Sequence, residues 1–214
     1  MKNCRIFNSL TDNQINLAKQ QLEGVIISYQ KGEMIIEENA VLKDMGILLT
    51  GNVCMSKFTL EGKEILMQKL VPPYLVGAEV ACTIRQDAPY SIYSTTDSDI
   101  YWFSIEKVME KGFIDDDIRV ILLRNIMYFI ADENIRKYYK VEAITIKGVR
   151  ERIVRYLSLQ QKKAGSSRFH IKFNREELAN FLVVNRSVLS HELRLMEKEG
   201  MIKFKKNYFE IIRL

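Results

Sequence analysis

The sequence contains few cysteines, and this scarcity limits the chemistry available to the chain. Its three cysteines, Cys4, Cys54 and Cys82, are an odd number without paired spacing, so we expect free thiols and not a disulfide framework. Cys54 and Cys82 stand among apolar residues of predicted strands, which favours a place in the core over a redox role. Cys4 lies close to the chain end, so a redox role stays open for it.

Long hydrophobic runs are also absent. No apolar run approaches the roughly 18 residues of a membrane-spanning helix, and Met1–Leu10 lacks the apolar stretch of a signal peptide. We therefore expect a cytoplasmic protein that does not contact a membrane. The 214 residues are 47% hydrophobic and include no low-complexity tract, which predicts a folded protein, most simply of two domains.

Sequence motifs for catalysis are missing as well. The chain has two histidines, His170 and His191, and no His/Asp/Glu cluster with the spacing of a metal site. It has no glycine-rich phosphate-binding loop and no nucleophile with a plausible base beside it. We therefore expect a protein that is not an enzyme and that holds neither a metal nor a cofactor.

Positive charge is concentrated in the last third of the chain. Residues 147–214 contain 16 Lys and Arg against 7 Asp and Glu, whereas the residues before them contain 16 and 20, for a net charge of +5 overall. This asymmetry indicates a negatively charged partner, most simply nucleic acid. Charge by itself is equally compatible with a solvated cationic surface.

The first half of the chain reads as one helix followed by short strands. Leu10–Gly24 has apolar residues at helical spacing, with Thr11 as its candidate N-cap. From Val25 to Ser104 the pattern changes to β-rich runs separated by turns, which predicts an all-β roll or sandwich. The turn signals are Lys31-Gly32, Thr50-Gly51-Asn52 and Glu61-Gly62.

A long helix is predicted next, opened by three consecutive acids, Asp115 to Asp117, which suit the positive end of a helix dipole. It carries two apolar stripes, namely Val120, Leu123, Met127, Ile130 and Asn134 at a/d-like spacing and Ile118, Leu122 and Phe129 on another face. One stripe suits the β-region and the other a symmetric copy of the same helix, so we expect a homodimer. The alternative is a helix buried on both faces within one chain.

The stretch Phe173–Gly200 predicts two short helices that meet at a three-residue corner. Asn174 is the candidate N-cap of a helix over Arg175–Leu182, with Glu177 placed to complete a capping box. Asn185 caps the second helix. The expected inner-face residues are Leu178, Ala179 and Leu182 on the first helix and Leu189, Leu193 and Met196 on the second. This is the pattern of a helix-turn-helix motif.

The outward face of the second helix carries side chains that can bond to base edges or phosphates. They are Arg186, Ser187, Ser190 and His191, with Arg186 the best candidate for a guanine. Met201–Ile212 alternates like two strands around Lys206-Asn207, which predicts a wing that Arg168–Phe173 can pair with. The expected DNA contacts outside the second helix are Asn174, Lys205 and Lys206.

The order of β-roll, long helix and winged helix-turn-helix resembles the Crp/Fnr superfamily of bacterial transcription regulators over nearly the whole chain. The matching motifs are Lys31–Glu33, Leu49–Val53, Leu60–Glu64, Arg152–Leu157, Asn185–Ser190 and Glu197–Ile202. The expected fold class is therefore α+β, with a double-stranded β-helix or jelly-roll sensor domain at residues 1–114. A dimerisation helix at 115–142 and a winged helix-turn-helix domain at 143–214 complete the expected division.

The resemblance implies a dimer that binds an inverted-repeat operator, acts with RNA polymerase and senses a signal in its β-roll. The corresponding effector residues are Gly77, Glu79, Tyr90 and Ser91, with Asn134 and Tyr138 on the long helix as relays. Tyr90 stands where the cyclic-nucleotide binders place an arginine, and a phenol cannot supply the charge that a buried cyclic phosphate needs. We therefore expect an effector other than cyclic AMP, unless Arg85 reaches into the pocket. The alternatives are a pocket filled by side chains, or a winged helix that contacts a protein partner.

An iron–sulfur centre needs four cysteine ligands and this chain has three, and both histidines lie outside the sensor region, which disfavours haem. Val183 stands at a corner position where glycine is common, and because a β-branched residue resists positive φ, we expect a reshaped corner. Glu192 occupies a usually apolar position, which leaves the docking angle of the second helix open.

Overall fold

The computed structural model describes residues 4–214, apart from the side chains of residues 143 and 144. The first three residues of Met1–Leu10, which the sequence analysis compared with a signal peptide, lie outside the described range. The described residues form two compact units, one made of the residues up to Lys57 together with Gln68–Ile135, the other of Phe58–Met67 and Arg136–Leu214. None of the helices in the described residues is long and apolar enough to cross a membrane.

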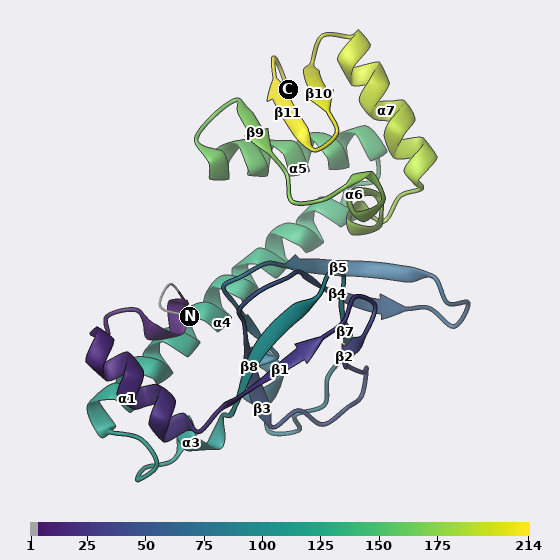
Figure 1. The fold of residues 1–214 in the computed structure, drawn as a ribbon. Helices are drawn as coiled ribbons and strands as arrows, with labels where there is room; N and C mark the ends of the chain where they lie inside the picture. Colours follow the sequence, from purple (N-terminus) through teal and green to yellow (C-terminus); the bar gives the residue numbers. More distant parts are fainter. Residues whose placement is uncertain (1–3) are drawn as a thin grey trace. The chain divides into compact units, whose positions relative to one another are not determined.

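The first unit contains several short helices besides the long helix α4, and the amino-terminal helical segment lies beside α4 (Figure 1). The helices are η1 (Arg5–Phe7), α1 (Asp12–Leu22), α2 (Ala78–Ala81), α3 (Glu106–Met109) and α4 (Asp116–Thr145), of which α4 continues into the second unit. Thr11 is the N-cap of α1, as predicted, and it also forms a capping box with Gln14. The Asn125 side chain donates to the carbonyl oxygens of Ile6 and Asn8 at 2.8 Å each, which ties the amino-terminal segment to α4.

Eight strands form the β-roll between α1 and α4. They are β1 (Val25–Tyr29), β2 (Met34–Ile36), β3 (Asp44–Leu48), β4 (Val53–Phe58), β5 (Glu64–Leu70), β6 (Tyr74–Val76), β7 (Ser91–Ser94) and β8 (Ser98–Ser104). Two four-stranded sheets result, in the orders β1-β8-β3-β6 and β2-β7-β4-β5. Gly32, Gly51 and Gly62, which the sequence marked as turn residues, all have positive φ. The predicted β-roll is confirmed.

Helix α4 begins as the sequence predicted, because the Asp115 side chain accepts hydrogen bonds from the backbone N–H groups of Asp117 and Ile118 at 3.1 Å. Its inner stripe, Ile118, Leu122 and Phe129, is buried. Val120 and Met127 of the other stripe are more than half exposed, together with Tyr128, Ile135 and Tyr138. Within the described chain, the alternative of a helix buried on both faces is therefore wrong.

The second unit contains the helix-turn-helix and its small sheet (Figure 1). Its elements are α5 (Val149–Ala164), β9 (Arg168–His170), α6 (Arg175–Leu182), α7 (Arg186–Lys198), β10 (Ile202–Lys205) and β11 (Tyr208–Ile211). All six predicted inner-face residues of α6 and α7 are buried. Strand β11 lies between β10 and β9, so the predicted pairing of β9 with the hairpin is confirmed. The α+β fold class expected from the sequence is confirmed.

Lys140, near the carboxyl end of α4, is a partly buried amine within this second unit. Its Nζ donates to the carbonyl oxygens of Leu66 and Met67 on β5 at 2.8 Å each and lies 4.4 Å from the centre of the Phe181 ring of α6. Burial lowers the pKa of Lys140 from 10.5 to about 8. One side chain thus joins α4, the β5 end of the hairpin and the first helix of the helix-turn-helix.

This shift predicts a stability that depends on pH. Between pH 8 and 10.5 the unfolded chain binds a proton at Lys140 that the folded chain has lost, so the free energy of unfolding rises with pH in this window. The total rise due to this group is at most about 3 kcal/mol. In denaturant titrations across this window, we expect the unfolding free energy of the wild type to rise relative to that of Lys140→Met. Parallel pH profiles for the two proteins would contradict the assignment.

Candidate nucleic-acid interface

The corner between α6 and α7 is built by helix caps and by the contacts of one arginine. Asn174 accepts from the Glu177 backbone at 2.9 Å while the Glu177 carboxylate accepts from the Asn174 backbone at 2.7 Å, which completes the predicted capping box. Val183 itself adopts the left-handed conformation, with φ 55° and ψ 52°. Val183 therefore takes the conformation that we expected a β-branched residue to resist, and the expectation of a reshaped corner is wrong.

Arg152 of α5 explains why the corner keeps this geometry. Its Nη1 donates to the carbonyl oxygens of Leu182 and Val183 at 3.1 and 3.3 Å, and its Nε donates to the Ile146 carbonyl at 2.6 Å. A cation at the carboxyl end of a helix stabilises the carbonyl groups that lack intrahelical partners. The Arg152 contacts therefore offset the strain at Val183, and the sequence motif that contains Arg152 gave no signal of this role.

The predicted reading face of α7 is open to solvent. Arg186, Ser187 and His191 are exposed and Ser190 is partly exposed. The Arg186 side chain is 64% exposed and its Nε lies 3.4 Å from the Glu176 carboxylate, a surface ion pair that water screens. Asn185 occupies the N-cap position as predicted, but its side chain makes no cap hydrogen bond. The backbone N–H groups at the start of α7 are therefore not satisfied by that side chain.

The wing is held next to α6 by Arg175. Its Nη2 donates to the Lys206 carbonyl at 3.2 Å, and its guanidinium lies 5.0 Å from the ring centre of Phe204 and 5.8 Å from that of Phe209. Burial, with a smaller effect of the neighbouring Arg186, lowers the pKa of Arg175. Arg175 thus fixes the turn that presents Lys206. No sequence motif pointed to this role of Arg175.

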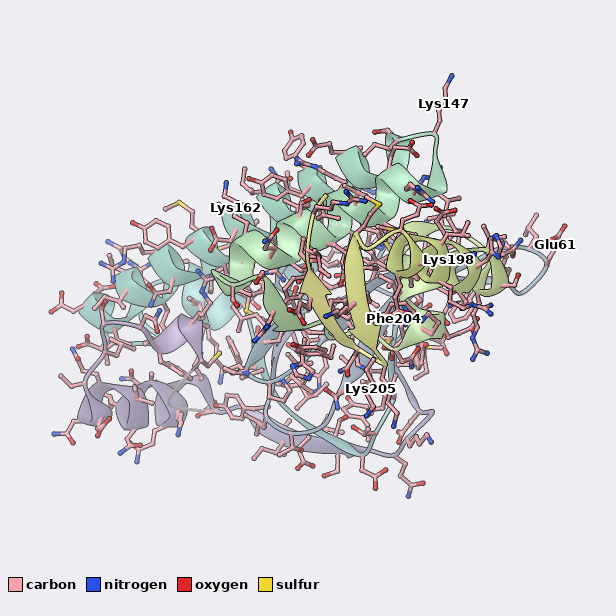
Figure 2. The ribbon with its side chains drawn as sticks, turned by 90° about the horizontal axis from the view of Figure 1, so that it is seen from above. Glu61, Lys147, Lys162, Lys198, Phe204 and Lys205 are labelled. Atoms are coloured by element: carbon pink, nitrogen blue, oxygen red, sulfur yellow. The ribbon has the colours of Figure 1, made fainter. Side chains whose placement is uncertain are left out.

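Exposed lysines surround these elements. Lys162 near the end of α5, Lys198 at the end of α7, and Lys205 and Lys206 of the wing are all exposed, and Figure 2 labels the first three together with Lys147. Lys147, between α4 and α5, extends clearly away from the fold in that view. The positive charge that the sequence concentrates in residues 147–214 therefore lies in part on solvent-exposed side chains of the helix-turn-helix unit.

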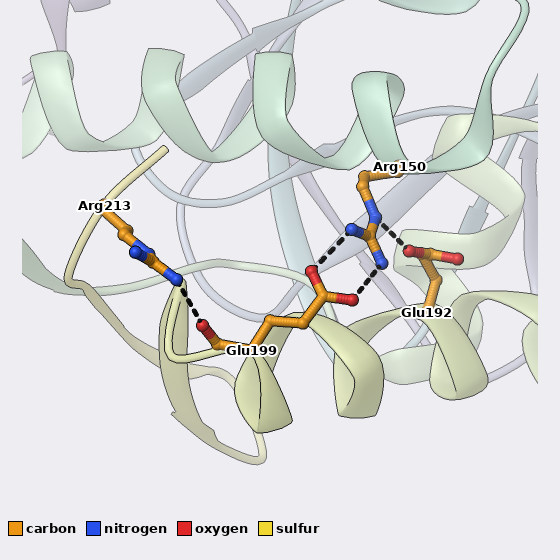
Figure 3. Close-up of polar contacts among 4 residues, drawn as sticks. All are labelled: Arg150, Glu192, Glu199 and Arg213. Carbon is orange, nitrogen blue, oxygen red and sulfur yellow. Dashed lines mark hydrogen bonds and ion pairs between the residues drawn. The ribbon is translucent and has the colours of Figure 1, made fainter.

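Glu192, which the sequence left without an explanation, pairs with Arg150 of α5 (Figure 3). Arg150 Nε donates to the Glu192 carboxylate at 2.5 Å, and its two terminal nitrogens donate to the Glu199 carboxylate at 2.7 and 2.9 Å. The backbone carbonyl of Glu199 accepts a further bond from Arg213 at 2.9 Å. The hydrogen bonds to Glu199 and Glu192 raise the pKa of Arg150, so this side chain stays charged between the two carboxylates.

The residues predicted to bind an effector in the β-roll lie in and beside its core. Gly77 has φ 72°, and a Cβ there would lie 2.3 Å from Leu42 Cδ2, so a larger residue would need both strain and movement. Tyr90 is 2% exposed, and burial, followed by the charge of Glu79, raises its pKa. The Ser91 hydroxyl accepts from the Glu38 backbone at 3.1 Å. Tyr90 and Glu79 therefore face each other inside the roll.

Arg85 does not reach towards Tyr90 in this structure. Its side chain is 88% exposed and lies 3.0 Å from the Asp87 carboxylate. Asn134 and Tyr138, the predicted relay residues of α4, are exposed. The inward-facing residue that the sequence analysis missed is Glu133, which is buried and accepts from the Gln68 side chain at 3.2 Å, while Gln68 also donates to the Tyr74 hydroxyl at 3.0 Å.

The three cysteines are free thiols, as predicted. Cys4 and Cys54 are buried and Cys82 is partly buried. Burial raises the pKa of Cys4, and burial together with the Glu79 charge raises the pKa of Cys82. Since the thiolate is the reactive form, Cys4, which we kept open as a redox residue, has surroundings that disfavour this role.

Comparison with protein families gives two matches. Residues 26–111 match the cyclic nucleotide-binding domain, and residues 151–214 match the Crp-like helix-turn-helix domain. A sequence comparison with curated proteins found no match. Among the described residues, no group of three or more His, Cys, Asp or Glu is placed to hold a metal ion.

Several solved structures share the fold at low sequence identity. The c-di-GMP responsive global regulator CLP of Xanthomonas campestris is 12% identical, with a TM-score of 0.73 over 94% of this chain and 99% of that one. FixK2 of Bradyrhizobium japonicum is 16% identical, with a TM-score of 0.68 over 89% and 93%. The catabolite activator protein of Thermus thermophilus is 19% identical, with a TM-score of 0.56 over 97% and 93%.

The two family matches cover different parts of the fold. The β-roll carries the match to the cyclic nucleotide-binding domain, and α5 to β11 carry the match to the helix-turn-helix. Proteins built in this way are transcription factors and not enzymes, and they are typically dimeric. The chain belongs to the Crp/Fnr family of DNA-binding transcriptional regulators with an effector-binding domain.

Proposed function

We propose that the protein is a homodimer that binds an inverted-repeat operator through α7 and the wing. The observation that carries the proposal is the exposed polar face of α7, Arg186, Ser187, Ser190 and His191, which shares one unit with the exposed wing lysines. The major groove admits a helix of this kind, and its base pairs differ in the donors and acceptors that such side chains address.

Each residue has a role that follows from its chemistry. Arg186 can donate two parallel hydrogen bonds to a guanine, and Ser187, Ser190 and His191 address neighbouring bases or phosphates. Lys205 and Lys206 would hold phosphates at the wing, as would Asn174, whose amide oxygen is used by the cap while its NH₂ group is the donor. These phosphate contacts set the position of α7, and the α7 contacts set the preferred sequence.

The exposed stripe of α4 supports the dimer. Large apolar side chains that stay in water along one helix mark an interaction surface, and a symmetric copy of the helix would cover them. A helix-turn-helix dimer reads two operator half-sites that lie about one helical turn apart, and we expect the same spacing here. We assign sensing to residues 1–114, dimerisation to residues 115–142 and DNA binding to residues 143–214, with RNA polymerase as a further partner at promoters.

For the effector, we propose a small molecule other than cyclic AMP, held near Gly77, Glu79, Tyr90 and Ser91. Asn134 and Tyr138 of α4 keep their proposed role as relay residues for the effector signal. The buried Tyr90 beside Glu79 supports this, because a desolvated cyclic phosphate needs a cation and not a phenol next to a carboxylate. The surface position of the Arg85 guanidinium, paired with Asp87, supports it as well.

Selection of bound DNA from random duplexes, followed by a salt titration of the selected operator, tests DNA recognition. Binding that neutralises several phosphates must weaken steeply as salt rises, and the selected sequence should be an inverted repeat. If no duplex binds at low salt, with or without added metabolites, the operator proposal fails and a protein partner of the winged helix becomes the better explanation.

A thermal-shift screen of metabolites tests the effector. A ligand present at about 100 times its Kd raises the free energy of unfolding by about 2.7 kcal/mol, which shows as a higher Tm. Tyr90→Phe, which removes only the hydroxyl beside Glu79, should reduce that shift, whereas Tyr90→Ala would lose about 3–5 kcal/mol of core stability and obscure it. A Tm shift of the wild-type protein with cyclic AMP would contradict the proposal.

A further inference from the structure

Glu192 of α7 and Glu199, the C-cap residue that follows α7, lie on a flank that is separate from the reading face. They are seven residues apart, which is roughly 10 Å along the helix axis. Arg150 of α5 bonds to both carboxylates at once through three donor nitrogens (Figure 3). One planar guanidinium therefore holds α7 at two points about two turns apart.

Contacts at two separated points control an angle that apolar packing leaves free. Leu189, Leu193 and Met196 bury the adjacent flank of α7, but burial of apolar surface is non-directional and permits small rotations. Hydrogen bonds to charged groups are directional, and a bidentate pair adds geometric specificity. A rotation of α7 about its axis or a change of its tilt would break at least one of the three bonds that Arg150 makes.

Glu199 also connects α7 to the strand that follows the wing turn. Its side chain bonds to Arg150 of α5, while its backbone carbonyl accepts from Arg213, two residues after β11. The helix that reads bases and the hairpin that carries Lys205 and Lys206 therefore share one anchoring residue. A shift of α7 relative to α5 would therefore also change the position of α7 relative to the wing.

We propose that Arg150 is a positioning residue for DNA recognition, which fixes the rotation and tilt of α7 through Glu192 and Glu199 so that Arg186 reaches its base in register with the wing. This proposal rests on the proposed operator binding. Arg150 touches no base itself. This role of Arg150 also explains why Glu192 is acidic at a position that is usually apolar in helix-turn-helix regulators of this kind.

A simpler role for Arg150 would be to neutralise two carboxylates that otherwise repel DNA. The two roles make different predictions for Arg150→Lys, because lysine keeps the charge but lacks the planar fork. If Arg150 positions α7, Arg150→Lys should bind the selected operator roughly tenfold more weakly, while its affinity for a random duplex stays within about twofold. The slope of affinity against salt should not change, because no phosphate contact is lost.

Fluorescence anisotropy with the full chain measures both affinities, and thermal unfolding measures the folded fraction of each variant. Arg155→Lys is the matched control, since Arg155 lies on the same helix and pairs with Glu142 of α4 and not with α7. It should keep the wild-type ratio of operator affinity to random-duplex affinity. Glu192→Gln/Glu199→Gln removes both negative charges and replaces one acceptor oxygen of each side chain by an NH₂ donor, so it should lower the same ratio without lowering affinity for random DNA.

Two outcomes would overturn the proposal. If Arg150→Lys keeps the wild-type affinity ratio, the fork is not needed and charge neutralisation is enough. If both affinities fall together in proportion to the folded fraction, Arg150 only stabilises the domain. Failure of the underlying function is seen earlier and separately, because the wild-type protein would then select no operator at all.

Discussion

Arg186→Ala is expected to weaken operator binding by at least roughly 30-fold and to relax the sequence preference. One bidentate arginine–guanine pair contributes about 1–3 kcal/mol, and a symmetric dimer loses two of them. Arg186 is exposed at the start of α7 and its surface pair with Glu176 is weak, so its loss should change the protein's own stability little. Anisotropy with the selected operator measures the affinity, and a second round of selection with the variant measures the preference.

Arg85→Ala provides the control for this experiment. Arg85 is likewise an exposed arginine with one carboxylate partner, but it lies in the β-roll. It should leave operator affinity within about twofold of wild type, because it contacts neither bases nor phosphates in the proposed arrangement. A selected sequence that is unchanged in Arg186→Ala would show that Arg186 does not read a base.

Met127→Asp is expected to convert the dimer to monomers at micromolar concentration. Met127 is 59% exposed in the single chain, so the aspartate can be solvated in the monomer, whereas the proposed dimer would bury two like charges in an apolar seam. That burial costs at least about 3 kcal/mol, which raises the dimer dissociation constant by roughly 100-fold or more. Sedimentation velocity measures the change in mass.

Met127→Asp should also weaken operator binding, because a monomer contacts only one half-site and each half-site contributes only part of the affinity. Met109→Asp is the matched control, since Met109 is an exposed methionine at the end of α3 and not on α4. It should remain dimeric and bind the operator normally. A dimer that persists in Met127→Asp would move the interface away from the exposed stripe of α4.

The elements of this fold that depend on neighbouring residues were predictable. Thr11 with Gln14 and Asn174 with Glu177 form capping boxes three residues apart, and the buried positions of α6 and α7 follow helical spacing. Glycine turns and strand-length runs predicted the β-roll for the same reason. These interactions act over a few residues, so their pattern is visible along the chain.

In α4, the local sequence pattern does not predict which polar residues face inward. The buried stripe of Ile118, Leu122 and Phe129 continues to Glu133, which is buried against Gln68, whereas the predicted relay residues Asn134 and Tyr138 are exposed. A polar residue on a helix is normally assigned to the solvent face. Only the position of Gln68 on β5 shows that Glu133 has a partner inside the unit.

The sequence by itself determined the order of elements, the caps, the two-helix motif and the concentration of positive charge, because these rest on residue type and short spacing. The tertiary structure alone decided how Val183 holds a left-handed corner and why Glu192 is tolerated. The answers are Arg152 and Arg150, which lie about 30 and 42 residues earlier in the chain. Hydrogen bonds and ion pairs between such distant residues depend on how the helices pack, and packing is a property of the whole unit.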